Sequence, residues 1–185
     1  MAHLTPLAQA GMNLPIWKFI EGRWVDFPHV ADLESVYMDK FKILMLNVWF
    51  GQFKRRERTS HQVQLFQQIN PDFICLQEGR VLLKIRQSTN DICLTRRYTV
   101  TKEYLDDLTS HEWIRDNYFS SNGIYRDFYG VFLLSKIRPM SVKLVALPSG
   151  MGRHLEVGTF RINNKTVSRQ VSSEILFPQN DLAKP

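Results

Sequence analysis

Two short apolar runs, separated by an amphipathic segment, constrain the fold of this chain more than any other feature. The run Phe41–Trp49 (FKILMLNVW) is strongly apolar, and its length favours a buried strand over a helix. Arg56–Ile69 has the spacing of an amphipathic helix. Phe73–Leu76 predicts a second, fully apolar strand. The order strand, helix, strand indicates a βαβ-like unit.

A polar residue follows each of these two strands. Asn47 ends the first apolar run, and Gln77-Glu78 ends the second. Because α/β folds place their clefts at the carboxyl ends of strands, Asn47 and Glu78 are the candidate site residues. An amide and a carboxylate in one cleft can orient a phosphate and hold a hard cation such as Mg²⁺. A solvated residue or a cap is the alternative interpretation of a strand-end glutamate.

The rest of the chain predicts further strands and helices. Strands are expected at 16–20 and 24–27, at 128–134 and 142–147, and at 155–162 followed by a turn into Thr166-Val167. Helices are expected at 31–37 and 103–118. On the helix at 56–69, Leu65, Phe66 and Ile69 are expected to share the apolar face.

The charge of the chain is unevenly placed. A chain of 185 residues with a net charge of +6 can form one domain and can bind nucleic acid or another polyanion. The segment Gly79–Thr99 holds five basic residues against Asp91 alone. Because the remainder of the chain is nearly balanced, the net charge by itself is a weak argument for a polyanionic partner.

Composition excludes several other classes of protein. No run approaches the roughly 18 apolar residues that a membrane span needs, and the N-terminus has no secretory pattern. Cys75 and Cys93 cannot build a disulfide framework, and Cys75 is expected to be buried. We therefore expect a reduced, intracellular compartment, the nucleus or the cytoplasm.

Longer motifs around these residues resemble the endonuclease/exonuclease/phosphatase family. They are Leu46–Trp49, Asn70–Glu78 and Phe128–Lys136, with Leu147–Ser149 and Met151–Arg153 closest to the tyrosyl-DNA phosphodiesterase 2 branch. The resemblance covers roughly residues 41–78 and 100–167. It implies a DNase I-like α/β (α+β) fold, a two-sheet β-sandwich flanked by helices, of which this chain holds a part.

The resemblance also implies a chemistry. The family member would be a magnesium-dependent phosphoric diester hydrolase acting on a phosphodiester, with DNA as one candidate substrate. Asn47 would contact the scissile phosphate or its attacking water, and Glu78 would bind Mg²⁺. Arg153 is a candidate substrate contact, with a structural salt bridge as the alternative.

The sequence departs from the family in two motifs that complete its site. Gly-Asp-x-Asn and Ser-Asp-His do not occur in this chain. His154-Leu155-Glu156 matches a third motif, but it opens a strand where the family's motif closes one, so we interpret it as a coincidence. Without the missing aspartate and histidine we expect negligible activity from this chain alone. We also expect an exposed sheet face that favours self-association.

The expected organisation has three parts. Residues 1–40 form an N-terminal tail and hairpin, 41–167 a partial domain and 168–185 a divergent tail. Residues 79–99 are an atypical insert, either a surface loop or retained untranslated sequence. Three functions stay open: a truncated phosphodiesterase, or one whose coding sequence is incompletely defined; a non-catalytic module that binds nucleic acid or a partner; and a chain that needs a complementing polypeptide.

Overall fold

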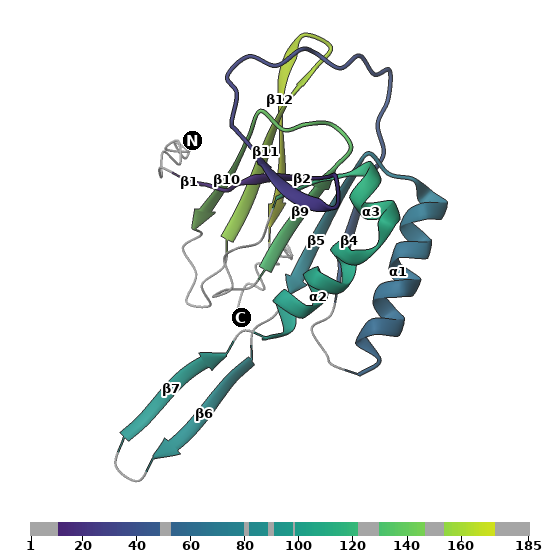
Figure 1. The fold of residues 1–185 in the computed structure, drawn as a ribbon. Helices are drawn as coiled ribbons and strands as arrows, with labels where there is room; N and C mark the ends of the chain where they lie inside the picture. The colour runs from purple at the N-terminus through teal and green to yellow at the C-terminus, as the bar shows by residue number, and fades with distance from the viewer. Residues whose placement is uncertain are drawn as a thin grey trace, which may run out of the picture.

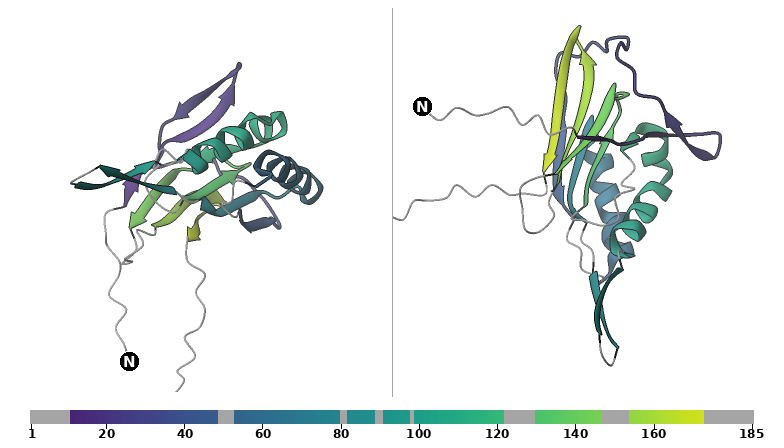
Figure 2. Two further views of the ribbon diagram at one scale, coloured as in Figure 1. Left: turned by 90° about the horizontal axis from the view of Figure 1, so that it is seen from below. Right: turned by 90° about the vertical axis from the view of Figure 1, so that its left-hand side faces the viewer.

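The protein is a three-layer molecule of two packed β-sheets and one layer of helices (Figures 1 and 2). The structure, a computed structural model, describes residues 11–48, 53–79, 82–88, 91–97, 99–121, 130–146 and 154–172. For the described residues between 78 and 102, and for 130, 146, 154 and 169–172, the description is of the backbone. The predicted fold class, a two-sheet sandwich flanked by helices, is confirmed.

The middle layer is a six-stranded sheet with the order β3-β2-β8-β9-β5-β4. Its strands are β2 (Ile16–Ile20), β3 (Arg23–Phe27), β4 (Ile43–Asn47), β5 (Phe73–Gly79), β8 (Phe119–Ser121) and β9 (Gly130–Ser135). The pair β4–β5 is parallel and the other neighbours are antiparallel. The predicted hairpin β2–β3 closes on Glu21 and Gly22, whose φ angles of 49° and 81° suit a tight hairpin turn.

The outer layer is a four-stranded antiparallel sheet with the order β1-β10-β11-β12. Its strands are β1 (Met12–Asn13), β10 (Ser141–Ala146), β11 (His154–Ile162) and β12 (Lys165–Ser172). The predicted turn after β11 is present, with Asn163 and Asn164 at φ 51° and 60°. β12 runs five residues past the expected Val167, because pairing with β11 continues to Leu155 and Ser172.

Helices α1 (Arg55–Ile69), α2 (Thr99–Ser110) and α3 (Glu112–Asn117) cover the other face of the six-stranded sheet (Figure 2). The predicted buried face of α1 was wrong in two of three positions, since Leu65 is 42% and Ile69 38% exposed. Thr59, Val63 and Phe66 are buried instead. Their spacing of four and three residues forms the stripe that faces the neighbouring elements.

Two predicted helices differ from the structure. The helix expected at 103–118 is divided at His111, whose extended backbone (φ −69°, ψ 125°) ends one helix and begins the next. No helix forms at 31–37, a segment that the structure describes as irregular. Instead, Val36 forms an isolated parallel bridge to Ile162 of β11. A long-range backbone contact therefore replaces the weak local helix tendency of this segment.

β5 separates two hydrophobic cores. Phe73 and Cys75 face the sandwich core between the sheets, whereas Ile74 and Leu76 face the core beneath the helices. This alternation follows from the two-residue period of a strand. Cys75 is 3% exposed, as predicted. The ring of Phe73 meets that of Phe160 edge-on, with centroids 5.0 Å apart.

Part of the predicted insert at 79–99 forms a separate hairpin. β6 (Leu82–Ser88) and β7 (Asp91–Arg97) make a two-stranded antiparallel sheet that projects from one end of the body (Figure 1). It lies between β5 and α2 in the sequence. Among the described residues, no helix is long and apolar enough to cross a membrane.

Candidate active site

The candidate site lies where the parallel strands β4 and β5 end. Their register pairs Leu46 with Leu76 and Asn47 with Gln77. The N–H of Val48 donates to the carbonyl of Gln77 at 3.0 Å, which extends the pairing one step beyond β4. Glu78 is therefore one residue beyond the partner of Asn47. The backbones of the two residues selected from the sequence therefore lie at the same end of adjacent strands, one register step apart.

A β-bulge marks the end of β5. The register with β9 pairs Leu76 with Phe132 and then Gly79 with Gly130, so β5 has one residue more than its partner over this interval. Bulges bend a strand, interrupt its ladder and often lie next to active sites. The irregular pairing includes Glu78, the residue expected to bind a metal. The backbone at this position is thus distinct from the regular sheet that precedes it.

Asn47 lies on the face of β4 that is turned away from the helices. The side chains of Leu44 and Leu46 pack against the helix-side core. Ile43, Met45 and Asn47 occupy the alternate positions and are exposed. Asn47 is thus an exposed residue at the end of an edge strand of the described sheet.

The described residues show no cluster of metal ligands. Among them, no group of three or more His, Cys, Asp or Glu side chains could hold a metal ion. Mg²⁺ is commonly bound through one or two protein carboxylates, with waters and substrate oxygens in the other positions. Glu78 is a carboxylate at the end of β5, which is the residue type that such a site requires.

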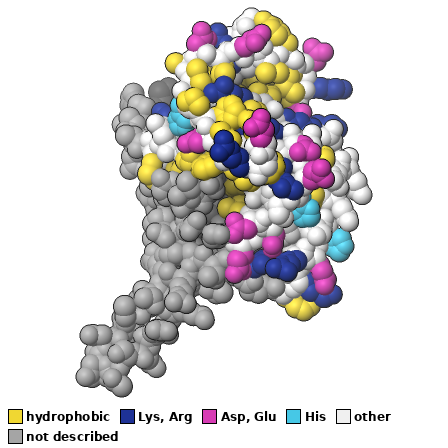
Figure 3. Space-filling model, viewed as in Figure 1, with side chains coloured by type: hydrophobic (Ala, Val, Ile, Leu, Met, Phe, Trp, Pro, Cys, Tyr) yellow, Lys and Arg dark blue, Asp and Glu magenta, His cyan; other side chains and the backbone are white. Residues whose placement is uncertain are grey.

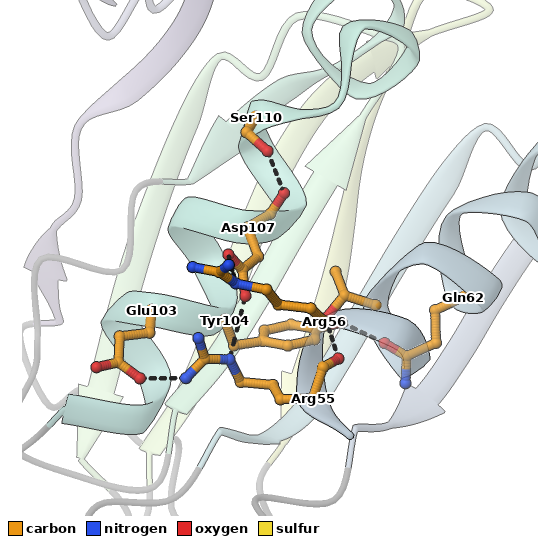
Figure 4. Close-up of polar contacts among 8 residues, drawn as sticks. Arg55, Arg56, Gln62, Glu103, Tyr104, Asp107 and Ser110 are labelled. Carbon is orange, nitrogen blue, oxygen red and sulfur yellow. Dashed lines mark hydrogen bonds and ion pairs between the residues drawn. The ribbon is translucent and has the colours of Figure 1, made fainter. Parts of the chain in front are cut away.

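An ion-pair cluster joins the starts of α1 and α2, close to the candidate site in the sequence (Figure 4). Arg55, whose side chain is 15% exposed, pairs with Glu103 and donates from Nε to Asp107 Oδ2 at 3.1 Å. The hydroxyl of Tyr104 donates to Gln62 Oε1 at 2.9 Å, and burial raises the pKa of Tyr104. These contacts hold together the helices that follow β4 and the hairpin.

The sequence interpretation did not include this cluster. The sequence does hold one indication of the cluster: Glu103 and Asp107 are four residues apart and so share one face of α2. The sequence does not indicate which basic residue pairs with these two carboxylates, since Arg55 is 48 residues away from Glu103. Arg55 therefore takes part in the packing of α1 against α2.

Glu156 of the His-Leu-Glu tripeptide lies in the sandwich core and not at the strand-end edge. It is 1% exposed, and its Oε1 has no hydrogen-bond partner. Burial raises the pKa of Glu156 to about 8, although hydrogen bonds with the Ser121 side chain and the Leu133 backbone lower it in part. Burial thus disfavours the charged form of Glu156, and β11 begins at His154, so this tripeptide opens a strand as the sequence predicted.

Other candidates are placed as follows. Arg153 lies outside the described residues. Tyr118 is fully buried and donates from its hydroxyl to the carbonyl of Pro71 at 2.6 Å, and Trp113 packs against it with ring centroids 5.2 Å apart. These two aromatic residues therefore belong to the helix-side core. His61 is exposed on α1 and His111 precedes α3.

Comparison with known proteins identifies the fold. No protein-family model and no curated protein matches this sequence. D. rerio TDP2 complexed with a single-strand DNA product matches with a TM-score of 0.55 at 15% identity, over 77% of this chain and 49% of that one. D. rerio TDP2 humanized by 14 mutations matches with a TM-score of 0.53 at 15% identity, over 71% and 46%.

A third structure is described as an endonuclease/exonuclease/phosphatase family protein, from Leptotrichia buccalis C-1013-b. It matches with a TM-score of 0.50 at 15% identity, over 77% of this chain and 57% of that one. The fold is that of the endonuclease/exonuclease/phosphatase proteins. The resemblance derived from sequence motifs is thus confirmed in the architecture.

The endonuclease/exonuclease/phosphatase fold is present here in part. The chain spans about half the length of the solved structures that it matches. At 15% identity the match shows the fold alone. The chemistry of Asn47 and Glu78 is therefore a matter for proposal and experiment.

Proposed function

We propose that this chain carries the phosphate-binding and metal-binding part of a phosphodiesterase site, with Asn47 and Glu78 as its catalytic residues. The observation that supports the proposal is the register of β4 and β5, which sets the backbones of these two residues at the same end of adjacent strands, one step apart and beside a bulge. A fold shared with TDP2, one example of which holds a single-strand DNA product, supports a nucleic acid substrate.

Each residue has a distinct role in the proposed chemistry. The Asn47 amide donates a hydrogen bond to a phosphate oxygen and orients the phosphodiester. The Glu78 carboxylate holds Mg²⁺, which when bound neutralises phosphate oxygens as a Lewis acid. Catalysis of this kind rests on positioning and on charge stabilisation of the transition state.

The chain by itself is proposed to hydrolyse phosphodiesters negligibly. Its sequence contains neither Gly-Asp-x-Asn nor Ser-Asp-His, the motifs that would supply a base. Loss of general acid–base help alone lowers a rate by about 10²–10⁴-fold. The alternative function, a non-catalytic module that binds nucleic acid, is favoured by the same accessible edge. Binding and turnover must therefore be measured separately.

The test uses a 5′-phosphotyrosyl DNA oligonucleotide and a simple phosphodiester, with and without Mg²⁺. We expect no turnover above background, and we expect Mg²⁺ to tighten oligonucleotide binding. Glu78→Ala should abolish the effect of Mg²⁺, and Asn47→Asp should weaken binding about 10-fold through repulsion of the phosphate. Gln68→Ala, which removes an exposed amide on α1, is the matched control and should change nothing.

The outcomes separate the alternatives. Turnover that requires Mg²⁺ and is lost in Glu78→Ala would support the role of Glu78 and would refute the proposed inactivity of the chain. Binding that is insensitive to Mg²⁺ and unchanged in both variants would refute the roles of Asn47 and Glu78, and would leave the non-catalytic module as the better description.

A further inference from the structure

The hairpin of β6 and β7 is inserted beside the candidate site. β5, which carries Glu78, runs directly into it, and α2 follows directly after it. Figures 1 and 2 show that the hairpin projects beyond the body, at the end where α1 and α2 begin. A ligand that lies across the strand-end edge would therefore meet the hairpin as well.

The register of the hairpin gives it two different faces. Lys84 pairs with Thr95, Arg86 with Cys93 and Leu82 with Arg97, and residues paired in this way lie on one face. That face carries Lys84, Arg86 and Arg97, with Asp91 near the tip. The opposite face is formed by the intervening residues: Leu83, Ile85, Gln87, Ile92, Leu94 and Arg96.

This concentration of charge differs from the surface of the body. Figure 3 shows Lys and Arg interspersed with Asp and Glu over the described surface on that side. At the start of α1, Lys54 pairs with Glu57 at 3.2 Å, and Arg56, 86% exposed, lies 3.9 Å from Asp107. Basic residues of the body are thus partly balanced, whereas the basic face of the hairpin has one acidic residue.

A projecting two-stranded ribbon with a basic face is suited to binding a polyanion. An isolated two-stranded hairpin is only marginally stable in water, and like charges placed along one face repel one another. Binding a polyanion relieves this repulsion and releases counterions from the polyanion. The major groove of duplex DNA, about 12 Å wide, admits a two-stranded β-ribbon.

We propose that the β6–β7 hairpin is a nucleic-acid-binding arm whose basic face, Lys84, Arg86 and Arg97, contacts the phosphate backbone next to the candidate site. The proposal deepens the proposed function and rests on it for the position of the nucleic acid. It assigns the substrate class as a polynucleotide longer than the site itself. It also gives a role to a segment that interrupts the family pattern.

The test measures binding of a fluorescein-labelled DNA duplex and a labelled single strand by anisotropy, in EDTA, from 50 to 300 mM salt. The arm variant is Lys84→Gln/Arg86→Gln/Arg97→Gln in the full chain. We expect at least a 10-fold loss of affinity at 100 mM salt and a salt slope smaller by about 2, since each phosphate contact contributes about 0.7–0.9. The matched control, Arg23→Gln/Lys143→Gln/Lys165→Gln, removes three exposed cations from the sheets and should lose less than 3-fold.

Any of three results would contradict the proposal that the hairpin is a nucleic-acid-binding arm. They are an equal loss in both triple variants, an unchanged salt slope in the arm variant, and salt-dependent binding to anionic phosphatidylserine vesicles with none to DNA. A thermal melt of each variant shows whether it is folded. Because EDTA removes any metal-dependent contribution, loss of binding in the arm variant with no effect of Glu78→Ala would support the arm even if the proposed catalytic roles fail.

Discussion

The two faces of the six-stranded sheet are covered in different ways. One face is covered by α1, α2 and α3, which all come from residues 55–117 of the chain. The other is covered by the four-stranded sheet, whose strands come from both ends of the described chain. The helix layer is built largely from one continuous region, whereas the sheet layer requires distant segments to pair.

The two layers also differ in how far they extend. On the helix side, Leu44 and Leu46 of the edge strand β4 are half-buried. On the sandwich side, Ile43 and Met45 of the same strand are 42% and 61% exposed. β12, the last strand of the outer sheet, packs against β5 and β9. The outer sheet therefore leaves part of β4 uncovered, and this part lies next to Asn47.

The largest expected effect tests whether β4 is uncovered in solution. Phe73→Ala should lower the free energy of unfolding by about 3–5 kcal/mol, because the ring is fully buried between Phe41 and Phe160. Met45→Ala, on the same face of the sheet but on the uncovered strand, should cost less than about 0.5 kcal/mol. Urea denaturation followed by circular dichroism measures both.

A large loss of unfolding free energy in Met45→Ala would contradict the conclusion that this face of β4 is uncovered. It would mean that another surface covers Ile43 and Met45, as self-association would do. Sedimentation velocity of the wild type over a range of concentrations would then show whether a second copy provides the cover.

The next effect concerns the buried carboxyl of the sandwich core. Burial raises the pKa of Glu156 from about 4.5 to about 8, so the folded state holds a proton that the unfolded chain has lost. The contribution of Glu156 to stability is therefore fully present below about pH 4.5 and is lost as pH rises through about 8. Over that window the loss amounts to a few kcal/mol in the wild type.

Glu156→Gln should remove this pH dependence, because the amide is uncharged and similar in shape. Thermal melts at pH 5, 7 and 9 measure it, with the variant expected to be more stable than the wild type at pH 9. Parallel decreases in melting temperature for both proteins would show that another group titrates in this range. The Glu156→Gln substitution should leave the packing of the helix-side core unchanged.

The smallest expected effect concerns the helix side. Arg55→Met removes partly buried ion pairs with Glu103 and Asp107 and should cost about 1–2 kcal/mol. Arg56→Met, at an 86% exposed position of the same helix, should cost less than about 0.5 kcal/mol. High salt should narrow the difference in stability between the variants only in part, since the Arg55 side chain is 15% exposed and that of Asp107 23%, whereas Glu103 is 48% exposed. Equal costs would indicate that the cluster does not hold α1 to α2.

The sequence predicted much of the fold where local patterns are strong. β4, α1 and β5 were expected within two or three residues of their observed bounds, because alternating and amphipathic patterns follow directly from backbone geometry. Predictions failed where distant contacts decide. Leu65 and Ile69 are exposed because packing against α2 selects the face of α1 through Val63 and Phe66. The segment 31–37 is irregular because Val36 bridges to Ile162, far along the chain.

The candidate site residues stay a prediction, and the structure adds where their backbones lie. Asn47 and Glu78 could be selected because polar residues after buried strands are conspicuous in the sequence. The bulge at Glu78 could not, since a register shift between β5 and β9 depends on two segments that are more than 50 residues apart. The burial of Glu156 was also hidden, because the residue lies in a strand whose inner face depends on the second sheet.

By itself the sequence determined most of the strands and the helix α1, and which two polar residues lie at the ends of the parallel pair. Hydrophobic period and turn residues are local properties, so they can be read without a fold. Only the tertiary structure decided that Asn47 and Glu78 lie at the same end of adjacent strands beside a bulge, that Glu156 is buried between the sheets and that the described outer sheet leaves Ile43 and Met45 of β4 exposed. These are properties of pairing and packing between distant segments, and they have no counterpart in the order of residues along the chain.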